Sequence, residues 1–387
     1  MTVSADQPHS PSFTAIIEKF RQDVHDGRFT GTANLSPSLH VAQGAVKTLR
    51  DIIGRIRQDV PYSEVISVLR AVGKTLSECE PYRALIANVS RRVLRLVREE
   101  HHRCLQAESP VRAPQINQPL EGGVEGSPPS TALSPSQAKE ATAELRWGSM
   151  KNDILSCVGE YLDELSATKS ALCKQADKHV RNDETVLTYG QSKTIESFLA
   201  AAAVRRRFRV IVVESCPEKE GEVMANALRA HGVDVTIIPH SSVFAVMGDV
   251  GKVILGTQLV LANGGSLAQA GSQVIALCAK HYTVPVLVIS ATEKFSPYYP
   301  VDQICSAVVK CADNSEHSWE NRGKAENVLA MSEIPAHAVD RIEVSYVVTD
   351  YVKPGLVALY ITNEDSFDPS YAYRLISECY SPEDFDV

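Results

Sequence analysis

Polar residues and glycines follow three of the strands expected in the second half of the chain. The stretches are GQSK at residues 190–193, ESCPEKEG at residues 214–221 and ANGGS at residues 262–266. In an open α/β sheet, strand ends and helix N-termini converge, and ligands and catalytic groups gather there. The candidate pocket residues at these positions are Ser192, Lys193, Glu214, Asn263, Gly264 and Gly265.

These residue types favour binding over catalysis. Ser192 is suited to cap a helix, and the backbone amides beside it could also hold a phosphate; capping is the favoured interpretation. The pair Gly264 and Gly265 permits positive φ and a close approach of the backbone, but supplies no acid, base or nucleophile. The chain contains no P-loop, no Gly-x-Gly-x-x-Gly after a strand and no Gly-x-Ser-x-Gly elbow. We therefore expect a pocket without catalytic residues and without a cofactor.

Alternating strands and helices are expected to position these loops. Apolar runs such as RVIVVES at 209–215 and VPVLVIS at 284–290 are typical of strands buried on both faces, and helical spacing recurs between such runs. This alternation predicts a doubly wound, mainly parallel, Rossmann-like α/β domain over residues 181–387. Residues 257–273 are interpreted as the end of a strand, the glycine pair and the start of a helix, and Pro354 as the entry to another helix.

The first half of the chain has helical spacing instead. Apolar residues recur every three or four positions from residue 12 to about 103 and again from 154 to 165, which predicts a helical domain over residues 1–180. Six prolines lie between residues 109 and 135, with few large apolar side chains. Such a composition cannot repay the entropy of ordering, so we expect a flexible insertion at about 105–140 that interrupts the helical domain.

One helix of this domain carries a row of arginines. RRVLRLVRE at residues 91–99 interleaves arginine with apolar residues, as in an amphipathic helix. A solvated basic face is the favoured interpretation, and contact with an acidic protein partner or with RNA is the alternative. The candidates for such a contact are Arg91, Arg92, Arg95 and Arg98. A formal net charge of −8 argues against a general nucleic-acid binder.

The cysteines and the hydropathy pattern exclude further classes. Nine cysteines without a C-x-x-C pair indicate neither a zinc site nor a disulfide framework. No run approaches eighteen apolar residues, and the first residues lack the pattern of a signal peptide. We therefore expect a cytosolic protein with neither a membrane partner nor a bound metal.

Several stretches resemble, in order and spacing, the regulatory subunits of eukaryotic translation initiation factor 2B. They are LTYGQSKTIESFL, VVESCPEKEG, VGKVILGTQLVLANGG and ALCAKHYTVPVLV, and RRVLRLVREEHHR is similar to the helical domain of that family. Among its alpha, beta and delta types, the chain is most similar to beta, in the stretches FAVMGDVGKVILGT and GTQLVLANGG and in the ending PSYAYRLISECYSPED. The resemblance extends to the methylthioribose-1-phosphate and ribose-1,5-bisphosphate isomerases, which share the fold.

Those isomerases need a cysteine after the first strand and an aspartate in an Asn-Gly-Asp turn. The resemblance places Gly190 at the position of the cysteine and Gly265 at that of the aspartate, and an arginine of their phosphate site falls on Cys216. Because proton transfer requires a group that can take and return a proton, the loss of both residues implies that this chain is not an isomerase.

The resemblance implies a non-catalytic regulatory subunit of the guanine-nucleotide exchange factor for translation initiation factor 2. Its implied partners are the alpha, gamma, delta and epsilon subunits of factor 2B and the alpha subunit of factor 2. Epsilon carries the exchange activity, and the regulatory subunits sense phosphorylation of factor 2 in the stress response that slows initiation.

Two alternatives stay open from the sequence. One is a sugar-phosphate isomerase that uses other groups, such as Glu214 or Glu196. The other is a retained pocket that binds a sugar phosphate for regulation through Ser192, Lys193 and Asn263.

Overall fold

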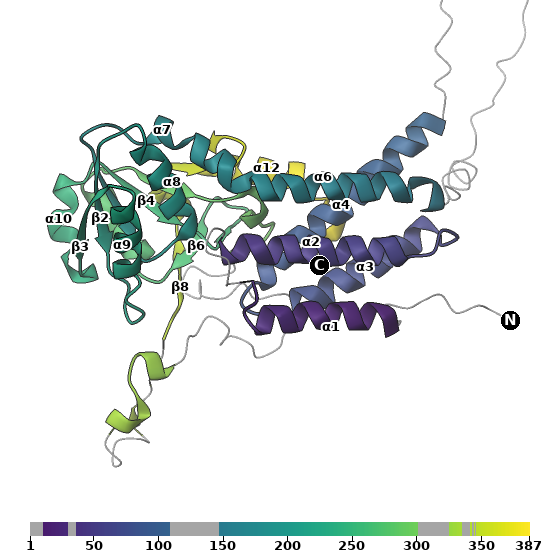
Figure 1. Ribbon diagram of the computed structural model, residues 1–387, viewed down its shortest axis with the longest axis horizontal. Coiled ribbons are helices and arrows are strands. Elements are labelled where there is room, and N and C mark those ends of the chain that lie inside the picture. Colours follow the sequence, from purple (N-terminus) through teal and green to yellow (C-terminus); the bar gives the residue numbers. More distant parts are fainter. Residues whose placement is uncertain are drawn as a thin grey trace, which may run out of the picture.

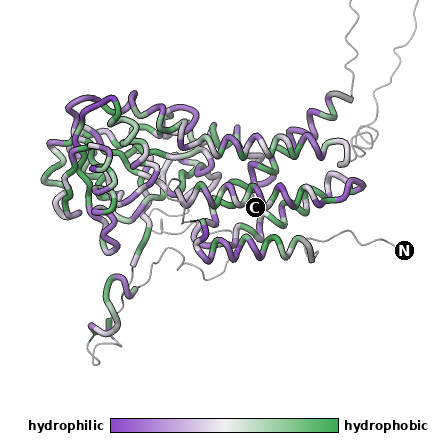
Figure 2. The backbone as a smooth tube through the Cα atoms, viewed as in Figure 1, coloured by the Kyte–Doolittle hydropathy of each residue, from purple (hydrophilic) through white to green (hydrophobic). Residues whose placement is uncertain are grey.

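The first half of the chain folds into a bundle of helices. The computed structural model describes residues 11–29, 36–108, 147–300, 325–334, 341–342, 344 and 346–387. The helices are α1 (Pro11–His25), α2 (Pro37–Arg55), α3 (Tyr62–Ser77), α4 (Arg83–Glu108), α6 (Trp147–Lys174) and α7 (Ala176–His179). Hydrophobic and hydrophilic residues alternate along the long helices, as Figure 2 shows. The apolar faces of α1, α2, α3, α4 and α6 meet in one core, whereas Ala176 of α7 packs in a core of the sheet half.

The second half is built on a seven-stranded sheet in the order β10-β9-β7-β4-β1-β2-β3. The strands are β1 (Thr185–Tyr189), β2 (Arg209–Val213), β3 (Asp234–Ile238), β4 (Lys252–Gly256), β7 (Val286–Ile289), β9 (Leu359–Ile361) and β10 (Ser366–Phe367). All neighbours pair in parallel except β9 and β10. The predicted mainly parallel sheet after a helical region is thus confirmed.

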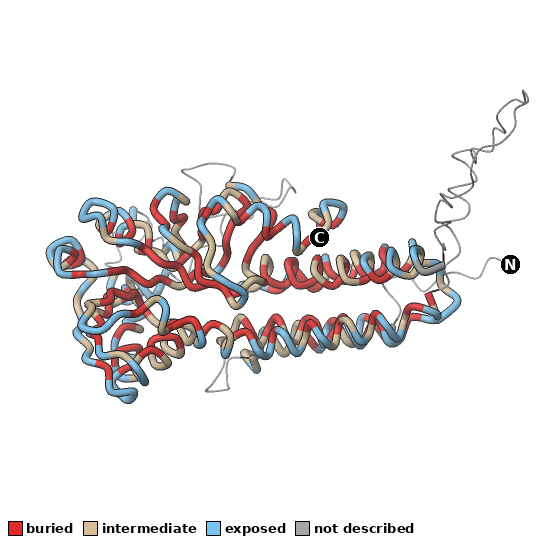
Figure 3. Tube along the Cα trace, turned by 90° about the horizontal axis from the view of Figure 1, so that it is seen from above, coloured by how far each residue is buried: buried red, intermediate tan, exposed pale blue. Residues whose placement is uncertain are grey.

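Helices cover both faces of this sheet. Helices α8 (Lys193–Ala203) and α9 (Gly221–Ala230) pack on one face, and α11 (Ser272–His281) and α12 (Ala372–Cys379) contribute to the core of the other. The short α10 (Val243–Val246) lies beside α11. In Figure 1 the sheet lies to the left of the helical bundle, and in Figure 3 its inner strands are largely buried while the long helices alternate buried and exposed residues.

A second, smaller sheet corrects one prediction from the sequence. Residues 257–273 do not lead from a strand through the glycine pair into a helix. They form β5 (Leu259–Val260) and β6 (Ser266–Gln269), an antiparallel hairpin that β8 (Thr349–Val352) extends. Helix α11 begins only at Ser272, after Gly271 at φ 104°. The side chains of β6 alternate between buried and half-buried, which is the period of a strand.

The prediction that a helix begins at Pro354 is also wrong. Pro354–Leu356 form one 3₁₀ turn, and β9 follows at Leu359. Its Val-Ala-Leu-Tyr-Ile run joins the main sheet beside β7, where it is largely buried, so pairing outweighs the local helix signal of the proline.

Two further expectations concern boundaries. The helices of the first half end with α7 at His179 and β1 begins at Thr185, while the division into two domains at residue 180 stays a prediction. Residues 105–108 of the flexible insertion expected at about 105–140 belong to α4, which continues to Glu108. Residues 109–146 lie outside the described residues, as do Cys305 and Cys311.

Candidate functional site

The sequence predicts that Gly190, directly after β1, takes the position of the isomerases' cysteine. Gly190 has φ 57°, a conformation that favours glycine. A Cβ atom placed on it would lie 2.3 Å from Oε1 of Gln269, which reaches across from β6. A side chain here would therefore be strained and would also displace Gln269.

Ser192 and Lys193 serve the start of α8. The Ser192 hydroxyl oxygen accepts a hydrogen bond from the Ile195 amide at 3.4 Å, which is an N-cap. The Lys193 ammonium lies 3.0 Å from Glu196 on the next turn of the helix. Both polar groups are therefore engaged within α8.

Glu214 closes the loop between β2 and α9. Its Oε1 accepts hydrogen bonds from the Gly221 amide at 2.7 Å and the Ser215 amide at 3.1 Å. Gly221 is the first residue of α9, so the carboxylate neutralises part of the positive end of that helix. An anionic ligand at this position would be repelled by the Glu214 carboxylate, which already accepts hydrogen bonds from the two amides that the ligand would need.

Asn263, Gly264 and Gly265 form the turn between β5 and β6, and the chain itself fills the space around them. The Asn263 amide donates to the Tyr351 hydroxyl at 2.6 Å and accepts from the Gly265 amide at 3.0 Å. A Cβ on Gly264 would lie 2.2 Å from the Pro369 carbonyl oxygen, and one on Gly265 would lie 2.4 Å from Cε2 of Tyr351. Tyr351, only 4% exposed, thus occupies the place into which an aspartate at 265 would project.

Within the described residues, the cavity that reaches Lys193 is lined by none of the other five candidate residues. This cavity has a volume of about 30 Å³ and is also lined by Ser38, Thr168 and Glu293. That volume holds a water molecule or two and is far too small for a sugar phosphate. The turn 263–265 lies at the far end of β6 from Gln269, so it faces different surroundings from Gly190.

The surroundings of Gly190 are acidic rather than basic. Burial, and then the neighbouring Glu218, raise the pKa of Glu220, which also accepts a hydrogen bond from Gln269 at 3.5 Å. Burial, and then Asp350 and Glu218, raise the pKa of Tyr189 to about 12. Such an environment disfavours a phosphate group, because like charges within a few ångströms repel.

Sequence reasoning missed Gln269 and Tyr351, the two residues that fill the site. The sequence does not point to Gln269, because its segment is predicted to lead into a helix. In the structure Gln269 lies in β6 and faces the end of β1. Tyr351 lies on β8, about 90 positions from the turn that it contacts, and only the pairing of β6 with β8 brings them together. The alternation of side chains in SLAQ was the one available signal of a strand.

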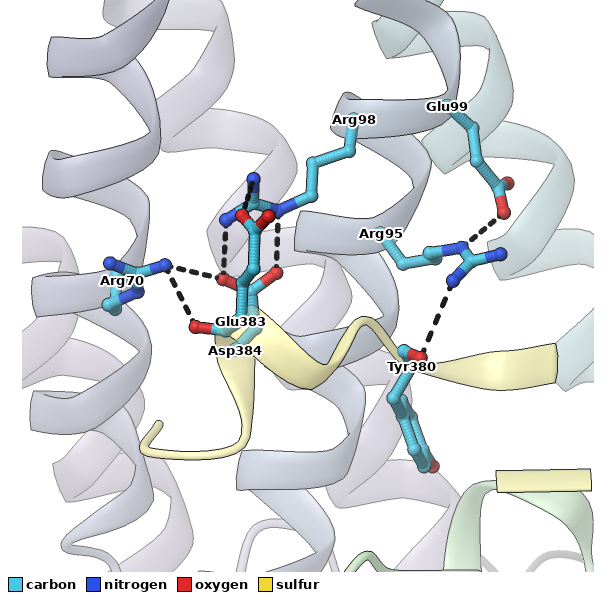
Figure 4. A network of polar contacts seen from close by, with 7 residues as sticks. All are labelled: Arg70, Arg95, Arg98, Glu99, Tyr380, Glu383 and Asp384. Carbon is cyan, nitrogen blue, oxygen red and sulfur yellow. Dashed lines mark hydrogen bonds and ion pairs between the residues drawn. The ribbon is translucent and has the colours of Figure 1, made fainter. Parts of the chain in front are cut away.

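The four candidate arginines of α4 all contact the C-terminal residues of the same chain. Arg91 is 0% exposed and donates to the carbonyl oxygens of Val387 at 2.6 Å and Phe385 at 3.0 Å. Arg98 binds both carboxylate oxygens of Asp384, at 2.8 and 2.9 Å (Figure 4). The favoured interpretation of a solvated basic face is therefore wrong for Arg91.

The other two arginines make longer contacts, with the last residue of α12 and the residue after it. Arg95 pairs with Glu99 and donates to the Tyr380 carbonyl oxygen at 3.4 Å, and Arg92 donates to the Cys379 carbonyl oxygen at 3.5 Å. Both side chains are half-buried. Their contact with a partner protein stays a prediction.

The described ranges show neither a cluster of metal ligands nor a helix that could span a membrane. Within them, no three His, Cys, Asp or Glu side chains gather in a way that could hold a metal ion. None of the described helices combines the length and the apolar character that crossing a membrane requires.

Comparison with known proteins gives matches along most of the chain. The model of the initiation factor 2 subunit family matches residues 34–369. Translation initiation factor eIF2B subunit beta of Schizosaccharomyces pombe is 32% identical over 89% of this chain and 92% of its own. The corresponding protein of Dictyostelium discoideum is 37% identical over 61% of this chain and 57% of its own.

Solved structures share the fold. The crystal structure of eIF2B beta from Chaetomium thermophilum matches with a TM-score of 0.66 at 22% identity, covering 96% of this chain and 94% of that one. A chain of the tetrameric eIF2B-beta2-delta2 complex from the same organism matches with a TM-score of 0.63 at 22% identity, covering 95% of each chain.

Proposed function

Since the chain belongs to the initiation factor 2 subunit family, we propose that it works as a beta-type regulatory subunit of the guanine-nucleotide exchange factor for translation initiation factor 2. In this role it is a structural and regulatory component and performs no chemistry of its own. Its place of action is the cytosol, where translation initiates.

The closure of the two strand-end positions carries the non-catalytic part of this proposal. Gly190 and Gly265 stand where the related isomerases place their cysteine and aspartate, and Gln269 and Tyr351 fill the adjoining space. A reaction by proton transfer would need both a reagent and room for the substrate. Neither of the two alternatives from the sequence, the isomerase and the metabolite-binding relative, gains support from this geometry.

The implied partners are the alpha, gamma, delta and epsilon subunits of factor 2B. An exposed apolar face supports contact with a partner subunit. It consists of Phe244, Val274, Leu277 and Tyr282, which are between 36% and 51% exposed. Val274 and Leu277 are three residues apart on α11 and form one pair, and the rings of Phe244 and Tyr282, 5.2 Å apart, form a second pair where α10 packs against α11. Side chains of this size at the surface are typical of protein interfaces.

Contact with the alpha subunit of factor 2 is the further part of the proposal. The phosphate on that subunit adds a charge near −2, which arginines recognise well. Because Arg91 is enclosed by its own chain, direct contact would fall to Arg92, Arg95 and Arg98 at the edge of α4. Charge reversal of these three, followed by binding of phosphorylated and unphosphorylated factor 2, tests this contact; unchanged affinity for both forms would exclude it.

The function itself is tested by nucleotide exchange in a reconstituted assembly. We expect the complete assembly to release GDP from factor 2 and to be inhibited by phosphorylated factor 2. The assembly without this chain should lose the inhibition, and the chain alone should neither exchange nucleotide nor convert a sugar phosphate. Turnover of a methylthioribose or ribose phosphate by the chain alone would contradict the proposal.

A further inference from the structure

The residues that follow α12 leave the sheet half of the chain and cross onto the helical half. Tyr380–Val387, here called the C-terminal segment, begins with Tyr380, which is 2% exposed and donates its hydroxyl to the Phe295 carbonyl oxygen at 2.9 Å. Its other end, Val387, is 5% exposed and packs in the core of the helical bundle. The C-terminal segment therefore bridges the two halves.

Helix α3 is shaped to receive the last residue. A Cβ on Gly73 would lie 3.0 Å from Cγ1 of Val387 and 3.0 Å from Cβ of Ser90 on α4. The missing side chain of Gly73 thus leaves the space that Val387 fills. Arg91 holds the backbone beside it through the carbonyl oxygens of Phe385 and Val387.

Asp384 is the charged anchor of the segment. Its side chain is fully buried, and its carboxylate accepts two hydrogen bonds from Arg98 on α4 and one from Arg70 on α3, the last at 2.8 Å. Arg70 also donates to the Glu383 carbonyl oxygen at 3.1 Å. Figure 4 shows the two guanidinium groups reaching Asp384 from different helices. The neighbouring Glu383 pairs with Arg98 as well, but its side chain is 69% exposed.

The C-terminal segment belongs to both cores, because Tyr380 lies in the core of the sheet half and Val387 in that of the helical half. In the described residues, Val387 is the one member of the helical core that lies beyond Leu165 in the sequence. The Nε atoms of Arg70 and Arg91 are buried without a hydrogen-bond partner among the described residues, so release of the segment would let water reach them. A buried ion pair contributes little net stability. Removing one of its partners is nevertheless strongly destabilising, because the other charge is left buried and unpaired.

We propose that the C-terminal segment is a releasable clasp: it holds the helical half against the sheet half, and Asp384 keeps it closed. When the clasp opens, both halves stay folded, and Arg70, Arg91 and Arg98 become accessible together. The open state therefore frees three guanidinium groups on α3 and α4, whereas in the closed state Arg91 is fully buried and Arg70 and Arg98 are engaged with Asp384.

Hydrogen exchange of the full chain within its purified assembly tests the clasp. The variant Asp384→Asn keeps the shape of the side chain and removes its charge. We expect amide exchange in residues 380–387 to become about tenfold faster or more, because local opening needs less free energy, while β1 and β2 exchange as before. The matched control is Glu383→Gln, which removes the exposed partner of Arg98 and should change exchange less than about twofold.

A second variant covers the case in which Asp384→Asn does not fold. Arg98→Lys keeps the positive charge but loses the two-pronged contact, so it should speed exchange of the segment relative to the unaltered chain while β1 and β2 exchange as before. Unchanged exchange of residues 380–387 in both variants would overturn the proposal. Equal loss of protection in the segment, the helical core and β1 would overturn it too, because the clasp would then not open by itself.

Discussion

At the scale of single residues, two glycines decide what the candidate pocket can do. Gly190 and Gly265 supply no reagent, and the side chains of Gln269 and Tyr351 stand within 2.3 and 2.4 Å of where a Cβ would begin. Loss of chemistry and loss of space therefore go together. The close packing against the ring of Tyr351 favours glycine at position 265, and the positive φ favours it at position 190.

The substitution Gly190→Ala should destabilise the chain more than a comparable change elsewhere. A positive φ costs a residue with a Cβ roughly 1–2 kcal/mol, and the contact with Gln269 adds to that cost. The control is Gly232→Ala, since Gly232 also has a positive φ of 78° but no atom within 4 Å of its Cβ position. Thermal unfolding should show a larger drop in Tm for Gly190→Ala; equal drops would mean that Gln269 moves aside freely.

Introducing a cysteine at position 190 and an aspartate at position 265 should not produce an active isomerase. In the double variant Gly190→Cys with Gly265→Asp, the new carboxylate would meet the ring of Tyr351, and Glu220 with its raised pKa would stay beside the new thiol. We expect no isomerisation of pentose phosphates above the rate without protein, measured by product formation. Turnover by this variant would show that the pocket is still open to substrate.

At the scale of elements, part of the fold could be predicted from the sequence and part could not. Apolar runs in the sequence correctly predict β2 and β7, because strands buried on both faces are largely apolar. The hairpin of β5 and β6 was missed, because two- and four-residue strands carry too short a period to separate from a helix start. The arginine row of α4 did follow the helical period, but its cover, the C-terminal segment, lies almost 300 positions away.

The anchor of the C-terminal segment should depend on pH in a defined direction. Burial raises the pKa of Asp384, but hydrogen bonds and charges from Arg98 and Arg70 outweigh it and hold the pKa below its usual value. A carboxyl whose pKa is lower in the folded state stabilises that state fully above its ordinary pKa of about 4, and this stabilisation is lost as the pH falls through the lowered pKa.

Exchange of residues 380–387, corrected for the intrinsic effect of pH, should thus stay constant from pH 7 to about 4 and rise below it. The variant Asp384→Asn should show no such rise, because it has no carboxyl to protonate. A rise that begins near pH 6 in the unaltered chain would assign the effect to another group.

At the scale of the whole molecule, the structure combines a closed pocket with an exposed apolar face. Phe244, Val274, Leu277 and Tyr282 gather on α10, α11 and the residue after α11, on the sheet half and away from the core of the helical bundle. An exposed apolar surface promotes aggregation of a solitary chain, whereas in an assembly it can be buried against a partner subunit. The exposed face, more than the pocket, is where the function of a regulatory subunit would reside.

A charge on this face should weaken assembly without unfolding the chain. Leu277 is 51% exposed, so Leu277→Asp removes little buried area from the chain itself. At an interface, the buried aspartate should lower the affinity for the partner subunit by about tenfold or more. The control Val204→Asp changes a residue that is 82% exposed at the end of α8. Equal recovery of partner subunits with both variants would move the interface to another surface.

The most direct test of the account is native mass spectrometry of the tagged full chain, captured from a cell extract at moderate salt. A regulatory subunit should be recovered in a stable assembly with four other subunits of the exchange factor, and with factor 2 at lower salt. Recovery of the chain alone or as a homo-oligomer, with no exchange-factor subunit bound, would contradict the account.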